Sequence, residues 1–225
     1  MIRPMIVFLI DTMDSNDLLM NAALTGNLSQ AQEAIDKGAD IGVIIEITAK
    51  KGHIEIVRLL MKKTKILDYA LLEASSEGHF DIVKLLVEAG AGKHDRALTC
   101  ASTIEIAKYM LSVGAKFYNG ALVNGASLGN MEIVQLMLSL AADNYDEAMA
   151  AASHYGQISI IDLMLSLGAK DYNKSLYNAA LGGQFHIVQY MLDLGARDFN
   201  SCVYGYCAQE IKDYINTCKQ GKLKL

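Results

Sequence analysis

The side chains that could bind a metal or act as nucleophiles are few and irregularly spaced. Three of the four cysteines, Cys202, Cys207 and Cys218, lie near the end of the 225-residue chain. Four residues separate Cys202 from Cys207, a looser spacing than the two-residue spacing of most zinc-binding cysteine pairs. This pattern favours reduced thiols in an intracellular protein over a metal centre or a disulfide framework. We therefore predict no metal site and a cytoplasmic location.

Groups that could carry out catalysis are also missing from the sequence pattern. No nucleophile with a base and an orienting acid occurs at a recognisable spacing, and neither does a pair of carboxylates. The glycine pair at 182–183 has the sequence of a turn and lacks the context of a phosphate-binding loop. The sequence predicts no catalytic residues, no cofactor and no enzymatic activity.

The polar side chains are carried by a unit of 27 residues that is repeated along the chain. Residues 145–171 align without a gap with residues 172–198, and residues 118–144 form a third copy. Such a repeat predicts an architecture of stacked units. Three series of residues recur at this offset: Tyr118, Tyr145, Tyr172 and Phe199; Met110, Met137, Met164 and Met191; and Gly129, Gly156 and Gly183.

Each unit has the pattern of a helical hairpin. The apolar residues of 172–181 fall on one helical face, those of 185–194 form a second stripe, and Gly183 lies between the two segments. Burying about five apolar side chains contributes roughly 7–15 kcal/mol. Ordering the backbone costs about 1–2 kcal/mol per residue, so one hairpin cannot fold alone. The hairpins must stack, which predicts an all-α solenoid with the methionine series in its core.

Polar residues mark the starts of the first helices. Asn144 followed by Glu147 has the pattern of a capping box, in which side chains bind the free amides of the first helical turn. Asp171 and Asp198 occupy the corresponding positions of the next two units. We expect them to cap their helices in the same way.

Composition restricts the class of partner. The chain is 52% hydrophobic and 20% charged, with a net charge of -5 and no long run of lysine or arginine. This argues against a nucleic-acid partner, whose binding depends on neutralising phosphates. The apolar run at residues 5–10 is too short to span a membrane. We expect neither nucleic acid nor membrane as a partner.

The repeats divide the chain into three parts. We expect residues 1–15 to cover the exposed end of the first hairpin, residues 16–197 to hold seven repeats, and residues 198–225 to form a capping half-repeat. The second repeat lacks the terminal Gly-Ala pair. The fourth has lost two residues between its helices, which predicts an irregular turn there.

The motif at residues 78–91, Gly-His-x-x-Ile-Val-x-Leu-Leu followed by Gly-Ala, resembles the second half of the ankyrin repeat. The Ala-Ala pairs at 22–23 and 179–180 fit the same family. Repeats of this short period are similar to those of ankyrin proteins that large DNA viruses of amoebae encode, which would place the protein in host cytoplasm. The resemblance implies that His53 and His79, beside their turn glycines, hydrogen-bond local backbone.

Two departures from the family pattern change the expected binding surface. The period is 27 residues instead of 33, and the family's Thr-Pro-Leu-His tetrapeptide is replaced, for example by Gly-Ala-Leu-Val at 120–123. The missing residues belong to the β-hairpin fingers of the family, so these fingers should be truncated to short turns. Contacts with a partner are then expected on the first helices.

The resemblance places the residues just before each turn glycine on a concave groove, together with some upstream residues of the same helices. Their chemistry changes from repeat to repeat while the core does not, and tyrosine is typical of protein-binding surfaces. Leu181 and Gly182 hold these positions in the last repeat. The candidate protein-binding residues are Lys50, Lys51, Glu77, Asn124, His154, Tyr155, Tyr177 and Asn178.

The sequence therefore predicts a monomeric, non-catalytic scaffold that binds another protein through its groove. One alternative is a substrate-recruiting adaptor of a larger assembly such as a ubiquitin ligase. It would need a second module, and no F-box-like segment follows the repeats. An enzyme is a further alternative, which would require a cleft with perturbed titratable groups.

Overall fold

The computed structural model describes residues 14–204 and 207–220, which form helices joined by short connections, with no strand among them. This confirms the all-α prediction for the described part of the chain. Residues 1–13 of the predicted terminal cover lie outside it. The chain divides into two compact units, unit 1 (Met1–Lys116) and unit 2 (Phe117–Leu225), and each is described by itself.

The described helices follow each other in pairs, each pair joined by a turn of a few residues. Unit 1 contains α2 (Ser15–Thr25), α3 (Leu28–Asp36), α4 (Ile44–Lys50), α5 (Ile54–Met61), α6 (Asp68–Glu77), α7 (Phe80–Glu88), α8 (His94–Cys100) and α9 (Ile104–Ser112). Unit 2 contains α10 (Tyr118–Leu128), α11 (Met131–Ser139), α12 (Tyr145–Tyr155), α13 (Ile158–Ser166), α14 (Tyr172–Leu181), α15 (Phe185–Asp193), α16 (Phe199–Tyr204) and α17 (Gln209–Lys219).

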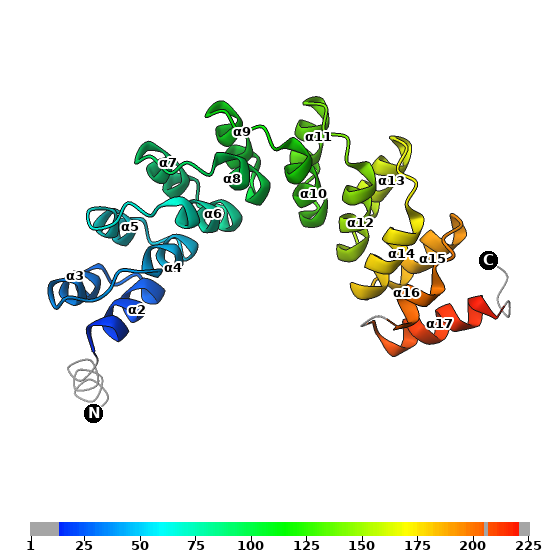
Figure 1. The fold of residues 1–225 in the computed structure, drawn as a ribbon, viewed down its shortest axis with the longest axis horizontal. Helices are drawn as coiled ribbons and strands as arrows, with labels where there is room; N and C mark the ends of the chain where they lie inside the picture. The colour runs from blue at the N-terminus through cyan, green and yellow to red at the C-terminus, as the bar shows by residue number, and fades with distance from the viewer. Residues whose placement is uncertain (1–13, 205–206, 221–225) are drawn as a thin grey trace. The chain divides into compact units, whose positions relative to one another are not determined.

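Within each unit the helices form two rows. The first helices of the pairs, α2, α4, α6 and α8 in unit 1 and α10, α12 and α14 in unit 2, lie side by side, and the second helices form the other row (Figure 1). The first helices contact their neighbours more extensively than the second helices do. Small residues allow this approach, because Ala22 and Ala23 in α2 and Ala179 and Ala180 in α14 are buried.

The core lies between the two rows of each unit. Met110, Met137, Met164 and Met191 are each 0% exposed, which confirms the prediction that the methionine series packs in the core. The irregular turn predicted for the fourth repeat is also present. There α8 is only seven residues long, and the residue that follows it is Ala101, with φ of -58° and ψ of 120°. By contrast, α10 and α12 are each followed by a left-handed glycine.

The predicted caps are confirmed at two of three positions. Asp171 accepts a hydrogen bond from the backbone N–H of Lys174 (2.9 Å). Asp198 accepts one from the backbone N–H of Ser201 (3.3 Å). The prediction is wrong for Asn144, whose side chain makes no capping bond. At the third helical position the backbone N–H of Glu147 helps to lower the pKa of its own carboxyl group, so this carboxylate lies near the amide that Asn144 would have bound. Lys174 offers no such acceptor.

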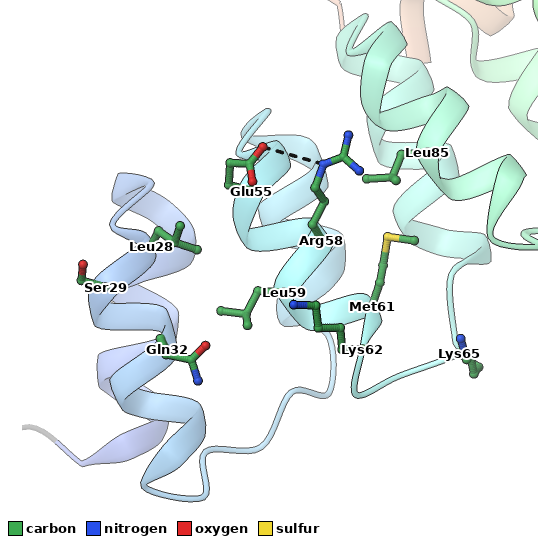
Figure 2. Close-up of a pocket in the computed structure, with 10 residues that line it drawn as sticks. All are labelled: Leu28, Ser29, Gln32, Glu55, Arg58, Leu59, Met61, Lys62, Lys65 and Leu85. Atoms are coloured by element: carbon green, nitrogen blue, oxygen red, sulfur yellow. Dashed lines mark ion pairs between the residues drawn. The ribbon is translucent and has the colours of Figure 1, made fainter.

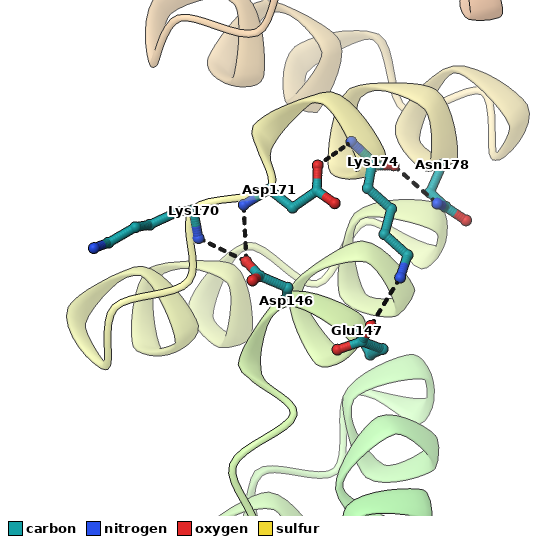
Figure 3. Close-up of polar contacts among 6 residues, drawn as sticks. All are labelled: Asp146, Glu147, Lys170, Asp171, Lys174 and Asn178. Carbon is teal, nitrogen blue, oxygen red and sulfur yellow. Dashed lines mark hydrogen bonds and ion pairs between the residues drawn. The ribbon is translucent and has the colours of Figure 1, made fainter.

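The connections between repeats are closed by a side chain in place of β-hairpin fingers. Asp146, in the first turn of α12, accepts hydrogen bonds from the backbone N–H groups of Lys170 (2.6 Å) and Asp171 (2.8 Å), as Figure 3 shows. Asn119 and Asn173 do the same for the connections that follow their repeats. These three residues recur at the 27-residue offset, so the pattern was visible in the sequence, although its role was not.

Replacing Asn173 by alanine is expected to loosen the connection after α15. Asn173 Oδ1 accepts from the N–H groups of Arg197 (2.7 Å) and Asp198 (2.9 Å). Losing these bonds should cost about 1 kcal/mol and speed amide hydrogen exchange at both residues, measured by NMR. Asn173→Asp is the matched control, because Asp146 makes the same contacts in the preceding repeat. Unchanged exchange in Asn173→Ala would show that the side chain does not hold the connection.

Ala141 lies in a backbone conformation that favours glycine. Its φ is 64°, whereas the equivalent residues Gly168 and Gly195 have φ of 103° and 107°. A left-handed conformation brings Cβ too close to the backbone. We expect Ala141→Gly to raise the free energy of unfolding by about 1 kcal/mol, measured by urea denaturation. Gly168→Ala should lower the free energy of unfolding by a similar amount, because alanine is strained at a φ of 103°. An added Cβ would meet nothing within 4 Å, so no clash adds to this cost. The same sign in both variants would contradict the argument.

Candidate protein-binding surface

In unit 1 the candidate residues lie where α4 and α6 end side by side. Lys50 is the last residue of α4 and Lys51 follows it, exposed to solvent. Lys50 Nζ lies 3.1 Å from Glu73 Oε2 and 3.8 Å from Glu77 Oε1, both on α6. The structure thus brings Lys50 and Glu77 together and adds Glu73, which the sequence analysis did not select.

The electrostatics of this group restrict what Lys50 can do. The hydrogen bond with Glu73, followed by the charge of the same carboxylate, raises the pKa of Lys50. Lys50 therefore stays protonated and is engaged within the repeat stack. Lys51 is exposed and appears in none of the ion pairs of this group, and Glu77 is the second, more distant carboxylate partner of Lys50.

The histidines beside the turn glycines link neighbouring repeats. His79 Nε2 lies 3.0 Å from the backbone oxygen of Lys50, and His53 Nε2 lies 3.4 Å from that of Leu24. A carbonyl oxygen only accepts hydrogen bonds, so the ring nitrogen donates. The expectation of a backbone contact is confirmed, but the acceptor belongs to the preceding repeat. These histidines therefore help to fix the spacing of the first helices.

In unit 2 four of the candidate residues lie together at the ends of α12 and α14. His154 Nδ1 is 3.2 Å from the backbone oxygen of Asn178, so α12 and α14 are tied at this end. The rings of His154 and Tyr155 meet edge to face, with centroids 4.7 Å apart and planes at 77°. Tyr155 and Tyr177 are exposed, at 58% and 36%. The structure brings these four residues to one region of the first-helix row.

Asn124 occupies a less accessible place on the adjoining helix. It is half-buried on α10, which packs against α12, and its backbone oxygen accepts a hydrogen bond from Ser127 (2.7 Å). Unit 1 and unit 2 thus each carry a group of candidate residues.

An ion pair that the sequence analysis did not select lies at the other end of the same two helices. Lys174 Nζ lies 3.0 Å from Glu147 Oε1, and both side chains are nearly half exposed (Figure 3). The hydrogen bond from Lys174 lowers the pKa of Glu147. These residues occupy the same position in successive repeats, 27 residues apart, and this spacing was the available signal. The ion pair is a second polar link between α12 and α14.

Gly182 does not face a partner, contrary to the prediction. A Cβ atom built on Gly182 would lie only 1.8 Å from the backbone oxygen of His154. This glycine is therefore the point at which the end of α14 lies against the backbone of α12. The sequence pattern alone cannot show this, because its φ of -77° is one that any residue adopts.

Two of the four cysteines lie in the interior. All four are free thiols, and Cys202 and Cys218 are buried. Burial raises the pKa of Cys202 to about 12, so its thiol stays protonated and is a poor nucleophile. Within the described residues, no three or more His, Cys, Asp or Glu side chains are grouped so that they could hold a metal ion.

Comparisons with known proteins bear on the family of the repeats. Every helix in the described part of the chain is too short or too polar to cross a membrane. The search of curated proteins gave no match. Among solved structures, the chain is similar to the human ASB11 ankyrin repeat domain, at 17% sequence identity and a TM-score of 0.41, over 88% of this chain and 96% of that one.

The sequence model of one family covers part of the chain. This family is described as "Ankyrin repeats (3 copies)", and its model matches residues 19–97 and 48–120. The matched residues include the motif at 78–91 and both turn histidines, His53 and His79. Residues 19–120 are thus similar to the ankyrin repeat family.

Proposed function

We propose that the chain is a non-catalytic scaffold that binds another protein through its row of first helices and the turns that follow them. Ankyrin repeats are in general protein-binding modules, and their match in residues 19–120 supports this class of function. The observation that carries the proposal is the pair of exposed tyrosines, Tyr155 and Tyr177, on neighbouring first helices of unit 2.

The backbone that presents these tyrosines is held at both ends. The His154 ring binds the Asn178 carbonyl at one end, and the Glu147–Lys174 ion pair links the helices at the other. Side chains on a fixed backbone lose little conformational freedom on binding, so more of the contact energy goes into affinity. Tyrosine supplies a large apolar face and a hydroxyl for hydrogen bonding, which suits it to anchor a protein partner.

The charged residues of unit 1 are assigned a different role. Lys51 and Glu77 are exposed and of opposite sign, while Lys50 is paired with Glu73. Exposed charges contribute little affinity, but they set orientation and association rate. We assign Lys51 and Glu77 of unit 1 to the orientation and association rate of a partner, and Tyr155 and Tyr177 of unit 2 to its affinity.

Affinity capture tests the proposal. The full chain and its Tyr155→Ala/Tyr177→Ala variant are used to capture proteins from cell lysate, with quantification by mass spectrometry. At least one protein captured by the wild-type chain should be reduced about tenfold or more by the variant, which corresponds to a loss of about 1.4 kcal/mol.

The matched control is Tyr69→Ala/Phe117→Ala. It also removes two exposed aromatic rings, at 49% and 58%, from the first turn of α6 and from the residue that precedes α10. This variant should capture the same protein as the wild-type chain does. Equal capture of every protein by the wild-type chain and both variants would remove the tyrosine pair from the proposed surface.

Several finer expectations continue as predictions from the sequence. They are the concave groove, the seven-repeat division with a cap at each end, the monomeric state and the cytoplasmic location. The similarity to ankyrin proteins of large DNA viruses of amoebae belongs with them. The adaptor role in an assembly such as a ubiquitin ligase is the alternative function, and a second module bound to the chain would be its signature.

A further inference from the structure

A cavity of about 950 Å³ opens on the row of second helices in unit 1. We call it the α3–α5 pocket. Leu28, Ser29 and Gln32 of α3 line one side, and residues of α5 line the other (Figure 2). The remaining lining comes from Met61 at the end of α5, from Lys62 and Lys65 in the connection that follows it, and from Leu85 of α7.

Four of the ten residues that line the pocket are apolar. Leu28 and Leu59 point into the space between α3 and α5, and Met61 and Leu85 add apolar surface (Figure 2). Leu28 is 43% exposed although it is a large aliphatic residue. A cavity of this size with several aliphatic side chains can bury apolar groups of a ligand.

The residues that line the pocket carry a net positive charge, in a chain whose net charge is negative. Arg58, Lys62 and Lys65 contribute three positive charges and Glu55 one negative charge, so the lining carries 3 - 1 = +2, against -5 for the whole chain. Glu55 is paired with Arg58, with Oε1 3.7 Å from Nε. Lys62 and Lys65 are exposed, and neither forms an ion pair with another residue in the described part of the chain.

The sequence of the first two repeats explains why the pocket forms here. Glu33 of α3 stands at the helix position that Leu59 holds in α5 and Leu85 in α7. It pairs with Lys37 of its own helix at 2.6 Å, so α3 offers no apolar side chain opposite Leu59 at this point. The second repeat also lacks the Gly-Ala ending, and residues 62–65 read Lys-Lys-Thr-Lys instead. An imperfect repeat therefore gives both the gap and its charge.

We propose that the α3–α5 pocket binds an acidic amphipathic helix of a protein partner. An elongated gap between two helices accepts the apolar face of a third helix, whose side chains at helical spacing fill the cavity. Leu28 and Leu59 would contact that face. Lys62 and Lys65 would attract acidic residues at its margins, and charge complementarity of this kind fixes orientation and raises the association rate. This site is separate from the tyrosine surface.

A peptide selection tests the proposal. Full-length protein is used to select from a displayed library of 16-residue amphipathic helices whose polar faces are randomised between acidic, neutral and basic residues. We expect the enriched peptides to be acidic. A synthetic copy of the most enriched peptide should bind at least tenfold more weakly, by fluorescence anisotropy, to Leu28→Asp and to Lys62→Glu/Lys65→Glu.

Each variant has a matched control. Leu28 is the first residue of α3, where an aspartate is compatible with the helix dipole. Ile158→Asp places the same change at the first residue of α13, at 44% exposure compared with 43% for Leu28. Lys63→Glu/Lys116→Glu matches the charge change at exposed positions outside the pocket lining. Both controls should bind the peptide within about twofold of wild type.

Several results would overturn the proposal. They are enrichment of neutral or basic helices, no enrichment at all, and equal binding of the peptide to all variants. A dimer in light scattering that Leu28→Asp dissociates would assign the pocket to a second copy of the chain. Because Tyr155 and Tyr177 are untouched in these variants, failure here leaves the proposed function standing.

Discussion

Leu122→Ala is expected to lower the free energy of unfolding by about 2–5 kcal/mol, the range observed when a fully buried leucine is truncated. Leu122 lies in α10, is 0% exposed, and its helix packs against both α11 and α12. The cost includes the lost burial and the cavity left behind. In a stack of repeats, stability depends on the contacts between neighbours, so a cavity beside α12 also weakens the next pair.

Urea denaturation followed by circular dichroism measures this effect. The control is Leu128→Ala, which makes the same change in the same helix at a residue that is 49% exposed. It should cost no more than about 0.5 kcal/mol, as is usual for surface substitutions. Equal losses in the two variants would mean that Leu122 is not in the core, and the two-row packing of unit 2 would be wrong.

Gly182→Ala is expected to lower the free energy of unfolding by about 3 kcal/mol, the upper part of the range for overpacking, although it adds only one methyl group. The added Cβ would lie 1.8 Å from the backbone oxygen of His154. A backbone oxygen cannot turn aside as a side chain can. The end of α14 must therefore move away from α12, which also breaks the contact between His154 Nδ1 and the Asn178 oxygen.

Two measurements distinguish the clash at Gly182 from a general cost of replacing glycine by alanine. Gly92→Ala should change stability by less than about 1 kcal/mol, because its added Cβ meets nothing within 4 Å. In Gly182→Ala, NMR should show shifted resonances for the His154 ring and faster amide exchange at the end of α14. A Gly182→Ala variant as stable as wild type would contradict the close approach of α12 and α14.

The spacing of apolar residues was sufficient to predict the two helices of the last full repeat. The sequence placed helical segments at residues 172–181 and 185–194, and the structure has α14 at Tyr172–Leu181 and α15 at Phe185–Asp193. The methionine series was placed in the core correctly as well. These features follow from the spacing of apolar residues within one chain segment, since a helix brings positions three and four apart to one face.

Contacts between repeats could not be predicted in the same way. The role of Gly182 and the Glu147–Lys174 ion pair depend on the distance between neighbouring helices. The missing cap at Asn144 depends on which side chain lies closer to the backbone amide at the start of α12. The α3–α5 pocket depends on Glu33 turning to Lys37 of its own helix. Sequence spacing does not encode these distances, although the recurrence of Asn119, Asp146 and Asn173 was a usable signal.

Hydrogen exchange with mass spectrometry tests most directly whether the first-helix row binds a protein. The chain is compared with and without the partner that the wild-type protein captures and the Tyr155→Ala/Tyr177→Ala variant does not. The proposed function predicts slower exchange in residues 145–157 and 172–184, which contain the first helices α12 and α14 and their turns. Protection confined to the second helices α13 and α15, with these segments unchanged, would contradict it.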